Sequence, residues 1–135
     1  MTTIPGTRAP GLLSPAVLLR AEGAALLAVS VAGYAGLDVS GGWWLFVACF
    51  LVPDIAMLGY LAGPAIGSRA YNLAHTEALP LLVLAAAWMT GETAWMAGAL
   101  IWLAHVGFDR VLGYGLKYPG AFRDTHLGRL GGSDA

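Results

Sequence analysis

Several histidine and acidic side chains interrupt apolar stretches of this 135-residue chain. A charged group at the centre of a membrane helix costs about 2.5–3.5 kcal/mol on insertion scales, so such groups usually mark a functional cavity. His105 and Asp109 are four positions apart and share a helix face. Asn72 and His75 are three positions apart and also share one. Each pair can therefore present two polar groups to the same site.

Asp54 adds a carboxylate from a third stretch, directly after Pro53, which releases a backbone carbonyl one turn earlier and makes room for a ligand or water. At about 1.5 Å of helix rise per residue, Asp54, His75, His105 and Asp109 lie in one layer. Carboxylate and imidazole donors of this kind suit Zn²⁺, Mn²⁺ or Fe²⁺. We therefore predict that all four residues bind a divalent metal. Asp54, His105 and Asp109 are also the predicted catalytic residues, acting through a metal-activated water.

Other functions fit the same residues. Buried polar groups, including a His–Asp pair, can simply hold membrane helices together. The main alternative is a non-enzymatic protein that binds or transports a proton or small molecule, which with so few helices would need a homodimer. Haem held by His75 and His105 is geometrically permitted, although the two carboxylates make the pocket acidic for it. Glu77 is expected to face away from His75, and Glu22 to pair with Arg20 at a helix start.

The composition requires a membrane to position these groups. Hydrophobic residues make up 58% of the chain and charged residues 11%, whereas a soluble domain has about 25% charged residues. Each apolar segment is close to the ~20 residues that cross a ~30 Å hydrocarbon core. Short turn-rich connections make neighbours antiparallel, which predicts an all-α, up-down-up-down four-helix bundle. The predicted helices are 15–36, 43–62, 70–89 and 93–112, with connections at 38–42, 63–68 and 90–92.

Domain boundaries follow from this division: an N-terminal segment 1–14, a membrane domain 15–112 and a tail 113–135. All seven Lys and Arg residues fall on one side of the predicted topology, while the connections around Asp38 and Glu92 carry none. The positive-inside rule then places both termini and the middle connection in the cytoplasm of a bacterial inner membrane. No cleaved signal peptide is expected, because Arg20 and Glu22 interrupt the first apolar run.

The tail could bind the substrate. Gly113 and Gly115 end the last helix where the membrane should end, which puts basic groups at the level of the lipid headgroups. Basic side chains there can hold phosphate, so we expect a lipid or lipid-linked phosphate as substrate. The predicted substrate-binding residues are Asn72, Lys117, Arg123 and His126. A net charge of −1 without a basic stripe excludes nucleic-acid binding, and the single Cys49 excludes an internal disulfide framework.

Four stretches of the sequence carry a family resemblance. They are 19–23 (LRAEG), 53–60 (PDIAMLGY), 71–76 (YNLAHT) and 105–128, which begins HVGFDR. Together they resemble, over about 18–128, the bacterial family known as domain of unknown function 4260. The resemblance implies a small multi-pass membrane protein and supplies no established activity.

The chain more distantly resembles LexA-regulated inner-membrane metal-dependent hydrolases. That class carries a Pro-Asp element, a helix beginning His-Arg-x-x-Thr-His-Ser, and His-x-x-x-Asp followed by Gly and Tyr-Pro. The matches, in order, are Pro53-Asp54, His105, Asp109, Gly113 or Gly115, and Tyr118-Pro119. The third helix departs, because Tyr71-Asn72 stand where His-Arg is expected and His75 is its only histidine. One ligand of that class is thus absent, which leaves a three-ligand site with an open position.

Overall fold

The computed structural model describes residues 11–120 and 123–129, which form four helical segments and a short β-hairpin. Ten residues of the predicted N-terminal segment and the last six of the predicted tail lie outside this range. The all-helical architecture is confirmed. The segments are α1 (Pro15–Ala35), α2 (Gly42–Cys49) with the 3₁₀-helix η1 (Val52–Ala62), α3 (Pro64–His75) with α4 (Ala78–Thr90), and α5 (Thr93–Leu112). The hairpin pairs β1 (Asp124–Thr125) antiparallel with β2 (Gly128–Arg129).

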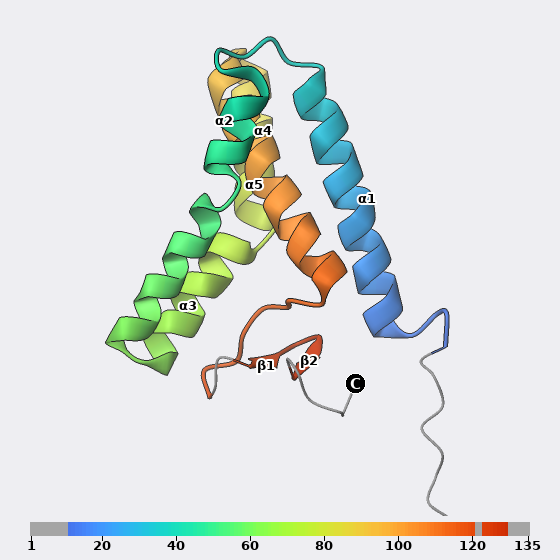
Figure 1. Ribbon diagram of the computed structural model, residues 1–135, viewed down its shortest axis with the longest axis vertical. Coiled ribbons are helices and arrows are strands. Elements are labelled where there is room, and N and C mark those ends of the chain that lie inside the picture. Colours follow the sequence, from blue (N-terminus) through green and yellow to red (C-terminus); the bar gives the residue numbers. More distant parts are fainter. Residues whose placement is uncertain (1–10, 121–122, 130–135) are drawn as a thin grey trace, which may run out of the picture.

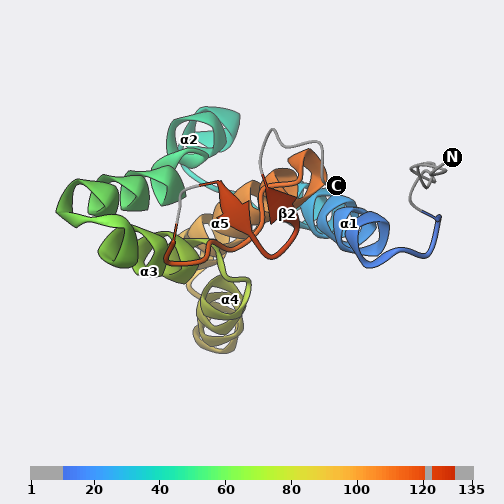
Figure 2. The same ribbon diagram turned by 90° about the horizontal axis from the view of Figure 1, so that it is seen from below.

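Helix α5 is the centre of the fold. Seen from below, α1 lies on one side of it and α3 on the other, while α2 and α4 flank it on opposite faces (Figure 2). Helices η1 and α3 form a hairpin that leaves the bundle at an angle (Figure 1). Most of the buried side chains of the described residues belong to α5, among them Ile101, Leu103 and Val106. Residues on the different faces of α5 can therefore reach each of the neighbouring segments.

Three of the four segments are long and apolar enough to cross a membrane. They are Pro15–Ala35, Gly42–Ala62 and Pro64–Thr90. Helix α5 is not among them, although the sequence predicts it as a spanning helix. It carries His105, Asp109 and Arg110, all of which are buried. The buried charged groups of α5 are thus enclosed by three segments that are long and apolar enough to cross a membrane.

The second segment is broken where Pro53 prevents a continuous α-helix. Pro53 has no N–H to donate, and its ring clashes with the carbonyl four residues earlier, that of Cys49, where α2 ends. The chain continues from Val52 as the 3₁₀-helix η1. The predicted single helix 43–62 is therefore two pieces, and Asp54 lies in the first turn of the second piece.

The predicted third helix 70–89 and the predicted connection 63–68 are both corrected by the structure. The chain reverses at Gly63, whose φ of 111° suits glycine, and α3 begins at once with Pro64 at its first position. Helix α3 ends at His75, and Thr76 is extended. Pro80 explains this second break, because its ring excludes a helical hydrogen bond to the carbonyl of Thr76. His75 thereby becomes the last residue of a helix.

Side chains of α5 bond the carbonyl groups that this break leaves free. The indole N–H of Trp102 donates to the carbonyl of Ala74 (2.5 Å). The guanidinium of Arg110 donates to the carbonyls of His75 (2.9 Å) and Tyr114 (2.7 Å). The last carbonyls of a helix have no partner within it, and an unbonded buried carbonyl is costly. These bonds fix the end of α3 against α5.

Glycines allow α1 to lie directly against α5. A Cβ on Gly23 would come within 2.4 Å of the Arg110 Cβ and 2.9 Å of the Gly107 carbonyl oxygen. A Cβ on Gly107 would lie 2.7 Å from the carbonyl oxygen of Gly23. Such close approach through small residues is typical of membrane helix pairs. Gly23 and Gly107 are thus the residues at which the two helix backbones approach each other most closely.

We predict that Gly23→Ala lowers the free energy of unfolding in detergent by about 1–3 kcal/mol, the usual cost of overpacking a close contact. Gly98→Ala on α5 is the control, because a Cβ at Gly98 meets no atom within 4 Å. This control should leave stability unchanged or slightly raised. Equal stability of both variants, measured by thermal or denaturant unfolding, would show that α1 and α5 have room for a methyl group at Gly23.

Candidate metal centre

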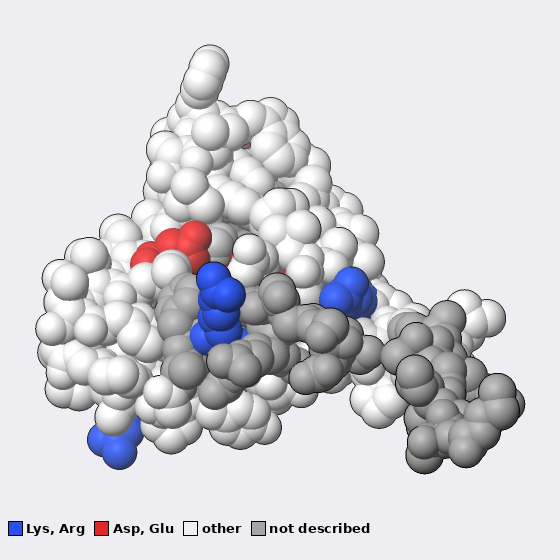
Figure 3. Space-filling view, turned by 60° about the horizontal axis from the view of Figure 1, so that its bottom comes forward, with Lys and Arg blue, Asp and Glu red and all other residues white. Residues whose placement is uncertain are grey.

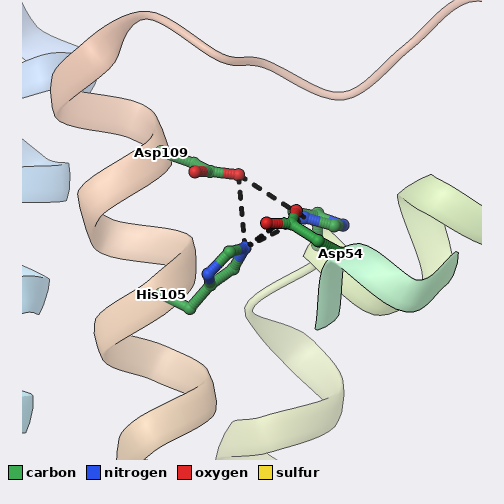
Figure 4. Close-up of side chains that lie close together, drawn as sticks. Asp54, His105 and Asp109 are labelled. Atoms are coloured by element: carbon green, nitrogen blue, oxygen red, sulfur yellow. Dashed lines mark hydrogen bonds and ion pairs between the residues drawn. The ribbon is translucent and has the colours of Figure 1, made fainter. Parts of the chain in front are cut away.

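Four side chains from three helical segments meet beside α5. His105 and Asp109 project from one face of α5 toward Asp54 of η1 (Figure 4). His75 enters from the end of α3. One donor atom from each of these residues lies within 4.8 Å of all the others. The predicted set of Asp54, His75, His105 and Asp109 is therefore brought together as expected, and we refer to it as the Asp/His cluster.

The spacing of the donor atoms fits a tetrahedral metal ion. Five of the six separations are known. The His75 Nε2 lies 3.3 Å from Asp54 Oδ1, 3.4 Å from Asp109 Oδ2 and 3.2 Å from His105 Nε2. The His105 Nε2 lies 3.3 Å from Asp54 Oδ1 and 3.5 Å from Asp109 Oδ2. Tetrahedral ligands about 2.0–2.2 Å from Zn²⁺ are about 3.3–3.6 Å from one another. The arrangement could therefore hold an ion at its centre without rearrangement.

Hydrogen bonds outside the cluster orient one of the two imidazoles. The Nδ1 of His75 lies 2.9 Å from the carbonyl oxygen of Tyr71. A carbonyl only accepts, so Nδ1 donates its proton and the lone pair of the neutral ring lies on Nε2, which faces the cluster. The Tyr71 ring stacks on His75 with centroids 3.7 Å apart, and its hydroxyl donates to Asp109 Oδ2 at 3.4 Å. By contrast, Nδ1 of His105 is buried with no hydrogen-bond partner among the described residues.

Burial differs among the four ligands in a way that matters for access. The side chains of His75 and His105 are almost fully buried, that of Asp109 is 13% exposed, and that of Asp54 is 37% exposed. Carboxylate atoms reach the surface next to a Lys or Arg side chain on the lower face of the molecule (Figure 3). The cluster is thus open on its carboxylate side and closed on its imidazole side.

A polar pocket of about 310 Å³ adjoins the open side of the cluster. Its walls include Asp54, Asp109 and Lys117, together with Met57 and the two tyrosines Tyr71 and Tyr114. The Lys117 ammonium lies 4.5 Å above the centre of the Tyr71 ring, a cation–π contact. Burial lowers the pKa of Lys117, an effect partly opposed by the Asp109 carboxylate. A cation is therefore held within reach of whatever enters the pocket.

The four residues predicted to bind substrate differ in whether they line the polar pocket, bond the backbone of the tail or are exposed. Lys117 lines the pocket. Asn72 uses both ends of its amide to hold the Lys117 backbone, donating to the carbonyl at 2.7 Å and accepting from the N–H at 2.6 Å. The Nδ1 of His126 accepts from the backbone N–H of Leu116 at 2.7 Å. Arg123 is exposed. Asn72 and His126 thus hold the tail that carries Lys117.

Sequence reasoning missed two residues of the site. Tyr71 is buried against His75, and its i,i+4 spacing to His75 is a signal that could have found it. Arg110 was counted only as an orienting charge, yet it bonds the carbonyl of the ligand His75. Its place next to Asp109 in the sequence could not distinguish these roles. Both residues hold ligands in place, as outer groups of metal sites commonly do.

Residues 16–130 match the family described as Domain of unknown function (DUF4260), so the chain belongs to that family. No curated protein and no solved structure matches the chain. The geometry of the Asp/His cluster is consequently the main guide to function.

We predict that Asn72→Ala loosens the segment that carries Lys117. The substitution removes two hydrogen bonds, each worth about 0.5–1.5 kcal/mol, so amide hydrogen exchange at Lys117 should accelerate about tenfold or more. Exchange in the interior of α5 should be unchanged. The matched control is Thr90→Ala, which removes a hydroxyl bonded to backbone carbonyls at the far end of α4. Unchanged exchange at Lys117 in Asn72→Ala would contradict the anchoring role.

Proposed function

We propose that this member of a family of unknown function is a membrane hydrolase that uses a divalent metal ion held by the Asp/His cluster. The observation that carries the proposal is the near-tetrahedral spacing of four donor atoms beside an open polar pocket. Two carboxylates and two neutral imidazoles supply a charge of −2, which a divalent cation balances. The mixture of nitrogen and oxygen donors favours Zn²⁺, with Mn²⁺ and Fe²⁺ as alternatives.

The charge of the pocket supports an anionic substrate. A divalent ion neutralises the two carboxylates, so Lys117 then gives the pocket a net positive charge. A phosphate ester carried by a lipid or lipid-linked molecule combines that charge with access from a bilayer. With a water or phosphoryl oxygen bound in addition to the protein donors, the metal would supply Lewis acidity, polarising a phosphoryl oxygen and lowering the pKa of a water to about 7.

The residues of the chain have separate roles in this reaction. Lys117 attracts and orients the phosphate, and Tyr71 holds Asp109 through its hydroxyl. In hydrolysis, the water oxygen bonds to phosphorus and the bond between phosphorus and the ester oxygen breaks. Asp54 is the most exposed ligand and lines the pocket. It is therefore suited to accept the proton of the water and pass it to the departing alkoxide, which leaves as an alcohol.

The charge distribution supports an orientation in a bacterial inner membrane with both termini in the cytoplasm. The connections after α1 and after α4 lie at the opposite end of the bundle from the start of α1 and the C-terminal segment (Figure 1). The Lys and Arg residues cluster in sequence at the latter end. The polar pocket, which includes Lys117 of the C-terminal segment, would then face the cytoplasmic leaflet.

We predict that chelator-treated protein binds one equivalent of Zn²⁺ and that His105→Ala weakens this affinity by more than about 100-fold, because a direct ligand is lost. Isothermal titration and elemental analysis measure the binding. Glu77→Gln is the control, because Glu77 is an exposed acid only two residues from His75. Release of phosphate from phosphatidic acid in mixed micelles should follow metal occupancy.

The outcomes separate the two parts of the proposal. Metal that binds equally well to the His105→Ala variant, or no bound metal at all, would overturn the metal site. Stoichiometric metal binding without release of phosphate would overturn the hydrolase while leaving the metal site intact.

We predict that Lys117→Met weakens inhibition by inorganic phosphate about ten- to a hundredfold, because a charged hydrogen-bond donor contributes about 1.5–3 kcal/mol. Metal content should not change, since Lys117 is not a predicted ligand. Arg123→Met removes an exposed cation from the same tail and is the matched control. If both substitutions weaken inhibition equally, the effect is one of general surface charge and Lys117 has no special role.

A further inference from the structure

An apolar groove lies on the other side of the Asp/His cluster from the polar pocket. Its volume is about 410 Å³, within the range of about 300–1,000 Å³ for small-molecule sites. Six of its lining residues are Cys49, Pro53, Ala56, Ala74, Gly98 and Trp102. All are uncharged, and the groove offers almost no polar surface. It is therefore suited to hydrocarbon rather than to water or ions.

The groove and the pocket are built from the same helices, although none of the described residues lines both. Helix η1 contributes Pro53 to the groove and the adjacent Asp54 to the pocket. Helix α3 contributes Ala74 to the groove and Tyr71 to the pocket, with His75 directly after Ala74. The same segments thus build two chambers, an apolar one and a polar one, close to a single cluster.

Helix α5 gives the order of these three parts along one axis. Gly98 and Trp102 line the groove, His105 belongs to the cluster, and Asp109 faces the pocket. At about 1.5 Å per residue, Gly98 is about 10 Å from His105 and Asp109 is about 6 Å beyond it. Polarity thus increases along α5 toward Gly113, where the helix ends. A membrane lipid has the same order, from its hydrocarbon chain to its headgroup at the membrane surface.

We propose that the groove binds the hydrocarbon chain of a phosphate-bearing lipid whose headgroup occupies the polar pocket. This inference rests on the proposed function and specifies its substrate class as a membrane amphiphile rather than a soluble phosphate ester. The match of polarity along α5, and the place of groove residues Pro53 and Ala74 directly before the cluster residues Asp54 and His75, favour a lipid chain over a second protein copy. The cluster then lies next to the junction of chain and headgroup.

The position of Gly98 allows a selective test. A Cβ there meets no atom within 4 Å, and Gly98 is exposed toward the groove. Gly98→Leu therefore fills the groove without displacing neighbouring atoms. Ala56→Phe fills it from η1 and guards against a folding defect in the first variant. Ala85→Leu places the same leucine side chain at an exposed position of α4, and is the matched control.

The probe is a long-chain alkyl phosphate with a photoreactive diazirine in its chain, used on the full-length protein in nanodiscs. Crosslinks in the wild type should map by mass spectrometry to residues 49–56 and 98–102. Gly98→Leu and Ala56→Phe should lower this labelling about tenfold, the effect of excluding roughly two buried methylene groups. Ala85→Leu should not lower it. Excess inorganic phosphate should compete, because the headgroup and phosphate share the polar pocket.

Three results would overturn the inference. The first is labelling that Gly98→Leu and Ala56→Phe leave unchanged while both variants retain wild-type melting temperatures. The second is equal labelling by a neutral alkyl alcohol probe, which would mean contact with bulk lipid only. The third is an unlabelled groove together with oxidative crosslinking of Cys49 between chains, which would mean that a second copy covers it.

Asp109→Asn separates this inference from the proposed hydrolase. That variant should lose metal and hydrolysis but keep the chain-dependent crosslinks, because Asp109 does not line the groove. Specific crosslinks in a protein that never binds metal would overturn the hydrolase and retain the lipid site. Metal-dependent hydrolysis of soluble esters without crosslinks in the groove would do the reverse.

Discussion

Two prolines that cannot continue an α-helix determine where the polar side chains of this protein meet. Pro53 ends α2 at Cys49, and Pro80 separates α3 from α4 at Thr76. In an unbroken helix, Asp54 and His75 would be mid-helix residues at positions fixed by the helix axis. The breaks instead free η1 and α3 to leave the bundle as a hairpin (Figure 1). Asp54 begins one arm of this hairpin and His75 ends the other.

Helix α5 offsets the cost of the second break, the one between α3 and α4. A broken membrane helix leaves backbone carbonyls that lipid cannot bond, so irregular backbone persists only where protein satisfies it. Trp102 and Arg110 donate hydrogen bonds to the carbonyls of Ala74 and His75. The Nδ1 of His75 donates to the carbonyl of Tyr71. Arg110 therefore acts in the fold as a carbonyl partner, although its charge also counts toward the membrane orientation. Removal of α5 from contact with α3 would leave the break at the end of α3 and the cluster without this support.

The hydropathy of the sequence and the depth of its charged residues along the predicted helices predict much of this arrangement. Particular residues show why. The ends of α1 and α5 follow from turn residues such as Gly36 and Gly113, and the predicted bounds agree within one residue. The cluster was predicted because charges in apolar segments are rare enough for their depths to be compared. The break at Pro80 was missed because hydropathy is averaged over a window. In that average, the apolar neighbours outweigh the polar pair Thr76–Glu77. The helix start at Pro64 was missed because Gly and Pro there also fit a longer connection.

The roles of tail residues could not be predicted in the same way. Lys117, Arg123 and His126 have similar types and lie within ten positions of one another, so the sequence gives no basis for separating them. The structure separates them by contact. Lys117 lies over the Tyr71 ring in the pocket, whereas His126 bonds the backbone of Leu116. The deciding partner, Asn72, lies 45 positions from Lys117. Such long-range pairings leave no periodic signal in one sequence.

The metal and proton interpretations of the cluster are two ways of meeting one electrostatic requirement. Because Nδ1 of His75 donates to a carbonyl, the lone pair on its Nε2 faces carboxylate oxygens 3.3 and 3.4 Å away. Lone pairs at that separation repel unless positive charge lies between them. Protons on the imidazoles can provide it, and so can one divalent cation at the centre. A cation satisfies all four donors at once, whereas protons satisfy them in pairs. The near-equal separations of 3.2–3.5 Å are those expected when four donors share one partner.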